Sequence, residues 1–151
     1  MKKNTKSIIG LLTAIVILSS CKKDKELSKT ELITKQPWKL TAFIQKNLST
    51  GAEQDNFAPM SACYKDDNFV YKADMSFEGN AGATKCSNTD PQVFQSGSWS
   101  FKNNETIVET VITSGLSAGS TFEYSVTSIT ATELKMHTVQ GGNDYLFTFS
   151  H

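Results

Sequence analysis

The chain has 151 residues, enough for one domain, and its 15 basic residues, all lysine, balance 15 acidic residues at a formal net charge of zero. Hydrophobic residues make up 38% of the sequence, which together with nine glycines is close to the usual apolar share of a soluble globular domain. This composition excludes an intrinsically disordered chain and a membrane protein with several spans, and the lack of a basic excess argues against nucleic-acid binding.

The first 20 residues have the pattern of a secretory signal peptide. Lys2, Lys3 and Lys6 precede an almost unbroken apolar run, Ile8–Leu18. A membrane-spanning helix needs about 20 apolar residues, whereas a charged start followed by about 7–15 apolar residues is typical of signal peptides. A buried N-terminal helix is the alternative, but the run offers no polar face.

The sequence Leu18-Ser19-Ser20-Cys21 resembles the lipobox of bacterial lipoproteins. This resemblance implies that residues 1–20 are removed, that Cys21 is acylated with fatty acids such as palmitate, and that the mature chain is anchored in a membrane of the cell envelope. The outer membrane is the expected location, and either its periplasmic or its external face is compatible with the sequence. Removal of three lysines leaves 12 lysines against 15 acidic residues, a mildly acidic balance that favours no attraction to nucleic acid or anionic lipid.

Residues 21–29 are predicted to be a flexible tether, and residues 30–151 one folded domain. A short helix is expected over Ser28–Lys35, because Ser28 or Thr30 can cap it and Pro37 ends it. After Pro37 the apolar residues alternate with polar ones, which predicts strands. Trp38, Leu40, Ala42 and Ile44 are expected on the inner face of the first strand, followed by a long irregular connection, Asn47–Ala62.

Seven further strands are predicted, separated mainly by tight turns rich in Gly and Asn, including a hairpin turn at Gly79–Gly82. With the first strand they make eight antiparallel strands, and no convincing helix follows the first one. Closure into an up-and-down barrel removes exposed edges, while a two-sheet sandwich is the alternative. The seven strands lie at Phe69–Glu78, Ala83–Asn88, Gly97–Phe101, Thr106–Thr113, Phe122–Thr127, Leu134–Val139 and Tyr145–Phe149.

Cys63 and Cys86 remain as a pair once Cys21 carries a lipid. In an exported chain an even number of cysteines indicates a disulfide, with two free thiols as the alternative. The bond would pin the long connection to the barrel and would stabilise the fold by roughly 3 kcal/mol. A zinc site is disfavoured because His137 and His151 lie far away in sequence.

The layout resembles the lipocalin-like domain found in many lipoproteins of the Bacteroidota type. The resemblance implies an all-β, eight-stranded antiparallel up-and-down barrel with a short N-terminal helix, in which Trp38 closes the floor of the barrel. The features that carry it are the lipobox at Cys21, the helix leading into Trp38, Cys63-x-x-Asp66-Asp67, the Phe69–Gly79 strand, Cys86, Gly97-Ser98-Trp99 and Ile129-Thr130-x-x-Glu133-Leu134.

The predicted function is binding rather than catalysis, and no cofactor or metal is expected. Two histidines do not easily furnish a catalytic triad, and Asp66-Asp67-Asn68 lacks the spacing of a calcium loop. A small hydrophobic ligand inside the barrel is the first hypothesis. Its candidate lining is formed by bulky residues of the strands, namely Trp38, Phe69, Tyr71, Met75, Phe77, Trp99, Phe101, Phe122, Tyr124, Met136 and Phe147.

The alternative is a structural or interaction module of the envelope, whose solid barrel contacts a protein or a glycan through loops 47–62 and 114–120. The sequence identifies no particular protein partner. The two hypotheses predict different interiors: an apolar pocket of about 300 Å³ or more favours ligand binding, and a packed interior favours the interaction module.

Overall fold

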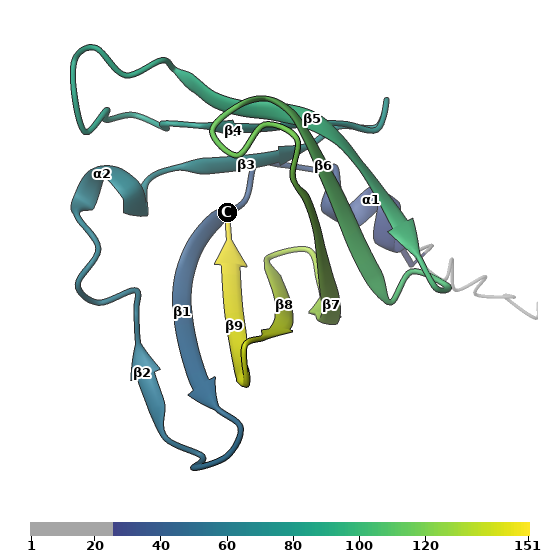
Figure 1. Cartoon of the computed structure of the whole chain (residues 1–151). Helices are drawn as coiled ribbons and strands as arrows, with labels where there is room; N and C mark the ends of the chain where they lie inside the picture. Colours follow the sequence, from purple (N-terminus) through teal and green to yellow (C-terminus); the bar gives the residue numbers. More distant parts are fainter. Residues whose placement is uncertain (1–25) are drawn as a thin grey trace, which may run out of the picture.

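The computed structural model describes residues 26–151, so the predicted signal peptide and Cys21 lie outside the described residues. The described part is mostly antiparallel β-structure with little helix (Figure 1). None of its helices is long and apolar enough to cross a membrane. The elements are α1 Lys29–Ile33, β1 Lys39–Asn47, β2 Glu53–Asp55, α2 Ala62–Lys65, β3 Asn68–Tyr71, β4 Ser76–Asn80, β5 Val93–Lys102, β6 Ile107–Gly115, β7 Thr121–Ile129, β8 Glu133–Gln140 and β9 Asn143–Ser150.

The predicted first helix is present as α1. Ser28 and Glu31 form a capping box, in which Glu31 N donates to Ser28 Oγ over 3.1 Å and Ser28 N donates to Glu31 Oε2 over 2.7 Å. This reciprocal pairing satisfies backbone donors that the first turn of a helix leaves open. Trp38 then ties the end of α1 to the sheet, because its Nε1 donates to the Ile33 carbonyl over 2.9 Å.

The strands form one sheet whose two ends meet. The order is β2-β1-β9-β8-β7-β6-β5-β4-β3, and every pairing is antiparallel. Trp38, which precedes β1, forms an isolated antiparallel bridge to Phe69 of β3, with N–H···O distances of 2.9 and 2.8 Å in the two directions. The bridge joins β1 and β3–β9 into a barrel-like wall, while β2 lies outside it. The all-β, barrel-like architecture predicted from the sequence is therefore confirmed.

The eight strands of the wall are not the eight that the sequence predicted. The strand expected over Phe69–Glu78 is two strands, because Met75 adopts a left-handed backbone conformation (φ 65°) and lets the chain turn between β3 and β4. The expected strand Ala83–Asn88 is wrong, since this segment is part of the loop between β4 and β5. The hairpin turn expected at Gly79–Gly82 is also wrong, because Gly79 pairs with Phe69 and with Gln95 inside β4.

A β-bulge in β1 reverses the inner and outer faces that were expected for this strand. The pairing with β9 shifts between Leu40 and Ala42. A bulge inserts one extra residue, so every following side chain changes sides. Phe43 consequently stacks on Phe147 with ring centroids 4.8 Å apart, and Ile44 pairs with the outward-facing Leu146. The prediction that Ile44 faces inward is wrong for this reason.

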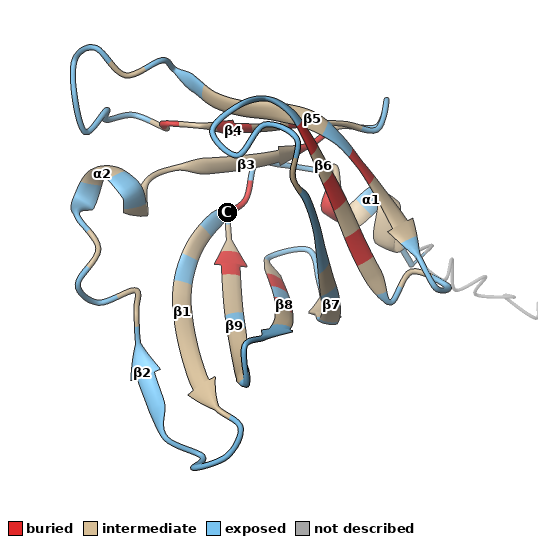
Figure 2. Cartoon of the chain, viewed as in Figure 1, coloured by how far each residue is buried: buried red, intermediate tan, exposed pale blue. Residues whose placement is uncertain are grey.

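The long connection after β1 also contains structure that the sequence did not indicate. Glu53–Asp55 forms β2, which pairs with residues 44–46 of β1 and is exposed throughout (Figure 2). Ala62–Lys65 forms α2, which carries Cys63. The predicted disulfide is present, with Cys63 and Cys86 Cα atoms 5.2 Å apart. It holds α2 to the loop between β4 and β5.

The core fills the end of the barrel that α1 covers. Trp38, Ile33, Leu134 and Val108 are fully buried there, and the buried segments of the strands are visible on β4–β6, β8 and β9 in Figure 2. The ring centroids of Trp38 and His151 lie 4.0 Å apart, so the last residue of the chain packs against Trp38 at this end of the barrel. This arrangement agrees with the expectation that Trp38 closes the floor of the barrel.

Candidate functional site

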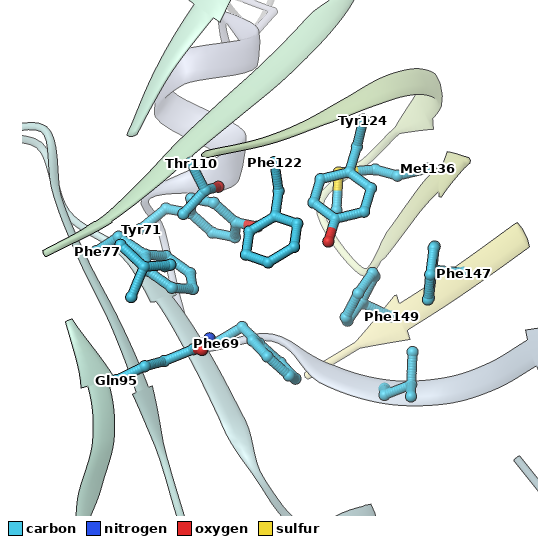
Figure 3. Close-up of a pocket in the computed structure, with 12 residues that line it drawn as sticks. Phe69, Tyr71, Phe77, Gln95, Thr110, Phe122, Tyr124, Met136, Phe147 and Phe149 are labelled. Atoms are coloured by element: carbon cyan, nitrogen blue, oxygen red, sulfur yellow. The ribbon is translucent and has the colours of Figure 1, made fainter. Parts of the chain in front are cut away.

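A partly open cavity of about 190 Å³ lies inside the barrel-like wall (Figure 3). Each of the eight wall strands contributes at least one residue to it, and β2 contributes none. The cavity is therefore the interior of the barrel and not a groove on its surface. Its lining is formed by Leu40, Phe69, Tyr71, Phe77, Gln95, Thr110, Ile112, Phe122, Tyr124, Met136, Phe147 and Phe149.

Seven of the residues proposed from the sequence as ligand-lining are among these twelve. They are Phe69, Tyr71, Phe77, Phe122, Tyr124, Met136 and Phe147. They come from five different strands, and alternation within each strand turns them to the same side of the sheet. Apolar side chains at alternate positions were the sequence signal that identified them.

Four other candidates lie away from the cavity. Trp38 is buried at the floor of the barrel, and Trp99 is buried with its Nε1 donating to the Lys72 carbonyl over 2.9 Å. Phe101 packs edge-on against Trp99 with ring centroids 5.5 Å apart. Met75 occupies the turn between β3 and β4 and is 45% exposed. These four residues, which were expected to line the ligand site, therefore do not line the barrel cavity.

Five lining residues were not proposed from the sequence. Leu40, Ile112 and Phe149 lie on predicted strands, so a complete use of the alternation would have included them. Gln95 and Thr110 are polar. The sequence did not indicate that they face the interior, because inner faces were identified by their apolar residues.

The polar groups of the cavity are three hydroxyls and one amide. Figure 3 shows the hydroxyls of Tyr71, Thr110 and Tyr124 among the aromatic rings, with that of Tyr124 directed into the open space, and the side chain of Gln95 at the opposite side. Thr110 is only 3% exposed, and its Oγ1 has no hydrogen-bond partner within residues 26–151. It lies close enough to the Tyr71 hydroxyl to favour the phenolate slightly, without forming a hydrogen bond.

The cavity is electrically neutral. Burial raises the pKa of Tyr71 far above its usual value, with a smaller contribution from Tyr124, and burial also raises the pKa of Tyr124. Both phenols therefore keep their protons at neutral pH and are hydrogen-bond donors. No Lys, His, Asp or Glu among the described residues lines the cavity.

The cavity adjoins a wider and more polar space at the open end of the barrel. Phe122, Tyr124 and Phe147 border both spaces, and the outer one measures about 640 Å³. Thr138 and Gln140, near the end of β8, line only the outer space. The three aromatic residues therefore form a boundary between a polar mouth and an apolar interior.

A second hollow, of about 450 Å³, lies beside the disulfide on the outside of this interior. Asp67 and Asp90 line it together with both cysteines and the exposed Leu116. Partial burial, together with the neighbouring charge of Asp66, raises the pKa of Asp67 to about 6 from its ordinary value of 3.8. The ionised form of Asp67 is therefore disfavoured in the folded protein.

The raised pKa of Asp67 predicts a pH-dependent stability. The folded protein holds this proton up to about pH 6, whereas the unfolded chain releases it near pH 3.8. The free energy of unfolding should therefore fall as the pH rises from about 4 to about 6. Asp67→Asn should remove this part of the slope and stabilise the protein at pH 7, as measured by urea unfolding at several pH values. Identical pH profiles for the two proteins would contradict the assignment.

The described residues contain no cluster of three or more His, Cys, Asp or Glu side chains that could hold a metal ion. His137 pairs instead with Asp144, its Nδ1 lying 2.8 Å from Asp144 Oδ1. The site with the clearest chemistry is the barrel interior, which offers apolar surface and a few neutral hydrogen-bonding groups.

The match to a protein-family model points to the same kind of domain. Residues 33–136 match the model of a family described as the lipocalin-like domain. Among solved structures, a lipocalin-like protein from Bacteroides uniformis ATCC 8492 is similar at 11% sequence identity, covering 74% of this chain and 93% of that chain with a TM-score of 0.44. Among curated proteins, none matches this chain.

Proposed function

This chain belongs to the lipocalin-like domain family, and from that premise we propose that it binds a small, mainly apolar molecule inside its barrel. Eight-stranded barrels either fill their interior with side chains or hold one small ligand. The observation that carries the proposal is the cavity of about 190 Å³ to which every strand of the wall contributes. The cavity is smaller than the about 300 Å³ expected of a ligand pocket, so the criterion for a large pocket is not met, but the interior is not packed either, as a module that acts only through its loops would require.

The volume of the cavity limits the size of the ligand. Ordinary ligand pockets begin at about 300 Å³, whereas an engineered apolar cavity of about 150 Å³ binds benzene. At about 190 Å³, the interior suits a molecule built on a single ring, and an extended fatty acid is too long for it.

Titration with toluene tests the proposal, monitored by NMR on the purified full chain. We expect shifts of the cavity residues and a Kd of roughly 0.1–1 mM, as for other ligands of this size. Leu40→Trp should fill the cavity and weaken binding at least about tenfold. Leu146→Trp is the matched control, because Leu146 is 38% exposed on the outer face of β9. Absence of cavity shifts with toluene, together with no small molecule co-purifying in native mass spectrometry, would refute the proposal.

We also propose that the binding domain is tethered to the cell envelope by lipid on Cys21, with the outer membrane as the expected site. The lipobox sequence after an apolar run supports this placement, and the Cys63–Cys86 disulfide is typical of exported proteins. Cells fed labelled palmitate should label the wild-type protein, and Cys21→Ser should abolish the label. Cys63→Ser, which also removes one sulfur, should keep it. Equal labelling of the Cys21 variant would refute the anchor.

A further inference from the structure

The most informative group in the barrel interior is the hydroxyl of Thr110. The residue is 3% exposed, and its Oγ1 has no hydrogen-bond partner within the described part of the chain. Native proteins rarely leave a buried polar group unpaired, so such a group calls for a specific explanation. Thr110 lines the cavity, and a ligand atom placed there would complete its hydrogen bonding.

Thr110 has other hydroxyls near it in the cavity. The hydroxyls of Tyr71 and Tyr124 also reach this space, and that of Tyr71 lies beside Thr110 (Figure 3). Hydroxyls from β3, β6 and β7 therefore line one otherwise apolar space, those of Tyr71 and Thr110 lying near each other. Each of these hydroxyls can donate a hydrogen bond to, or accept one from, an oxygen of a ligand.

The lining also determines which charge the ligand can carry. A buried carboxylate requires a cationic partner, and a buried ammonium requires an anionic one. Within residues 26–151, no charged side chain of either sign lines the cavity. Both tyrosines are protonated at neutral pH, and burial raises their pKa values further, so they supply no anion for an ammonium group.

The rest of the cavity surface is mainly aromatic. Phe69, Phe122, Phe147 and Phe149 surround the space below the hydroxyls in Figure 3. Aromatic rings pack well against a planar ring in offset or edge-to-face contacts. The volume leaves room for one ring with small substituents.

We propose, building on the function above, that the ligand is an uncharged, single-ring alcohol or phenol whose oxygen hydrogen-bonds with the Thr110 hydroxyl. The ring packs among the phenylalanines, and the hydroxyl occupies the polar corner of the cavity. Carboxylic acids and amines of the same size are excluded because their charge would stay unpaired.

Three matched probes test this specificity on the full chain: p-cresol, toluene and benzoate. They have similar rings, and they carry a neutral hydroxyl, no polar group and a negative charge, respectively. We expect p-cresol to bind at least about tenfold more tightly than toluene, which corresponds to one well-made hydrogen bond. Benzoate should show no binding.

Substitution of the hydroxyl identifies the group responsible. Thr110→Val keeps the side-chain shape and removes the unpaired hydroxyl, so the variant should fold and still bind toluene. Its preference for p-cresol over toluene should fall about tenfold. Thr127→Val, the same change at an exposed position of β7, should leave the preference unchanged.

The outcomes separate this inference from the function on which it rests. Equal binding of p-cresol and toluene, or tightest binding of benzoate, would overturn the hydroxyl specificity while leaving a ligand-binding barrel intact. An unchanged preference in Thr110→Val would overturn the role of Thr110. Failure of all three probes to bind would overturn the binding function itself.

Discussion

Replacing Trp38 by Ala should lower the free energy of unfolding by about 3–5 kcal/mol, the usual range for emptying a fully buried aromatic site. Trp38 is 0% exposed, its Nε1 binds the Ile33 carbonyl, and its backbone forms both hydrogen bonds of the bridge to Phe69. The substitution removes the buried indole ring together with its hydrogen bond to Ile33. Because small domains are typically stable by about 5–15 kcal/mol, this loss should be evident in urea unfolding curves.

A second substitution of Trp38 isolates the contribution of the indole N–H, and a substitution of an exposed tyrosine serves as the control. Trp38→Phe keeps most of the apolar surface but leaves the Ile33 carbonyl without its donor, so we expect a loss of about 1–3 kcal/mol. Tyr64→Ala removes an aromatic side chain that is 53% exposed and should cost less than about 0.5 kcal/mol. A loss below about 1 kcal/mol for Trp38→Ala would contradict its role at the floor of the barrel.

Removal of the disulfide should have the second largest effect. Cys63 and Cys86 are 23 residues apart in sequence, and a loop of this length predicts a loss of roughly 3 kcal/mol through the added entropy of the unfolded chain. The double variant Cys63→Ala with Cys86→Ala should therefore unfold at lower urea concentration. Reduction of the wild-type protein should give a similar shift.

The disulfide variant should nevertheless keep the barrel and its cavity. Neither cysteine lines the barrel interior. Asp66 also holds the same two segments together, because its Oδ2 accepts hydrogen bonds from Thr84 N and Thr84 Oγ1 over 2.9 and 2.7 Å. Toluene binding should thus survive the loss of the bond. A variant that loses binding while it remains folded would show that the disulfide shapes the cavity.

Much of the wall was predictable because a half-buried strand carries its own signal. The alternation at Phe122, Tyr124 and Val126 in β7, for example, requires only that one face contacts the core. The capping box at Ser28 is likewise a local property, since its partners lie three residues apart. Such features depend on neighbours in sequence, so the sequence alone indicates them.

The errors arose where one residue departs from the regular repeat. The bulge between Leu40 and Ala42 reverses the faces of β1, and the left-handed backbone at Met75 divides one apparent strand into two. An uninterrupted alternation of side chains cannot show either event. Both depend on long-range pairing, with β9 in the first case and with β5 in the second, where Trp99 N donates to the Met75 carbonyl over 2.9 Å.

The polar part of the cavity was unpredictable for a different reason. Thr110 and Gln95 face inward from β6 and β5, yet their side chains are those of an outer face. A sequence search assigns such residues to solvent by default. Only the position of their neighbours in the barrel wall shows that they face an enclosed space. Their polar groups are there available for hydrogen bonds with a ligand.

The single bridge between Trp38 and Phe69 gives the barrel a weak seam. Every other junction in the wall is a ladder of several paired residues, whereas here β1 diverges to pair with β2 and leaves β3 after one contact. Regions with few hydrogen bonds open locally at a free-energy cost far below that of global unfolding. Leu40 and Phe69 border both the seam and the cavity, so a guest molecule could enter and leave sideways while the remaining ladders stay intact.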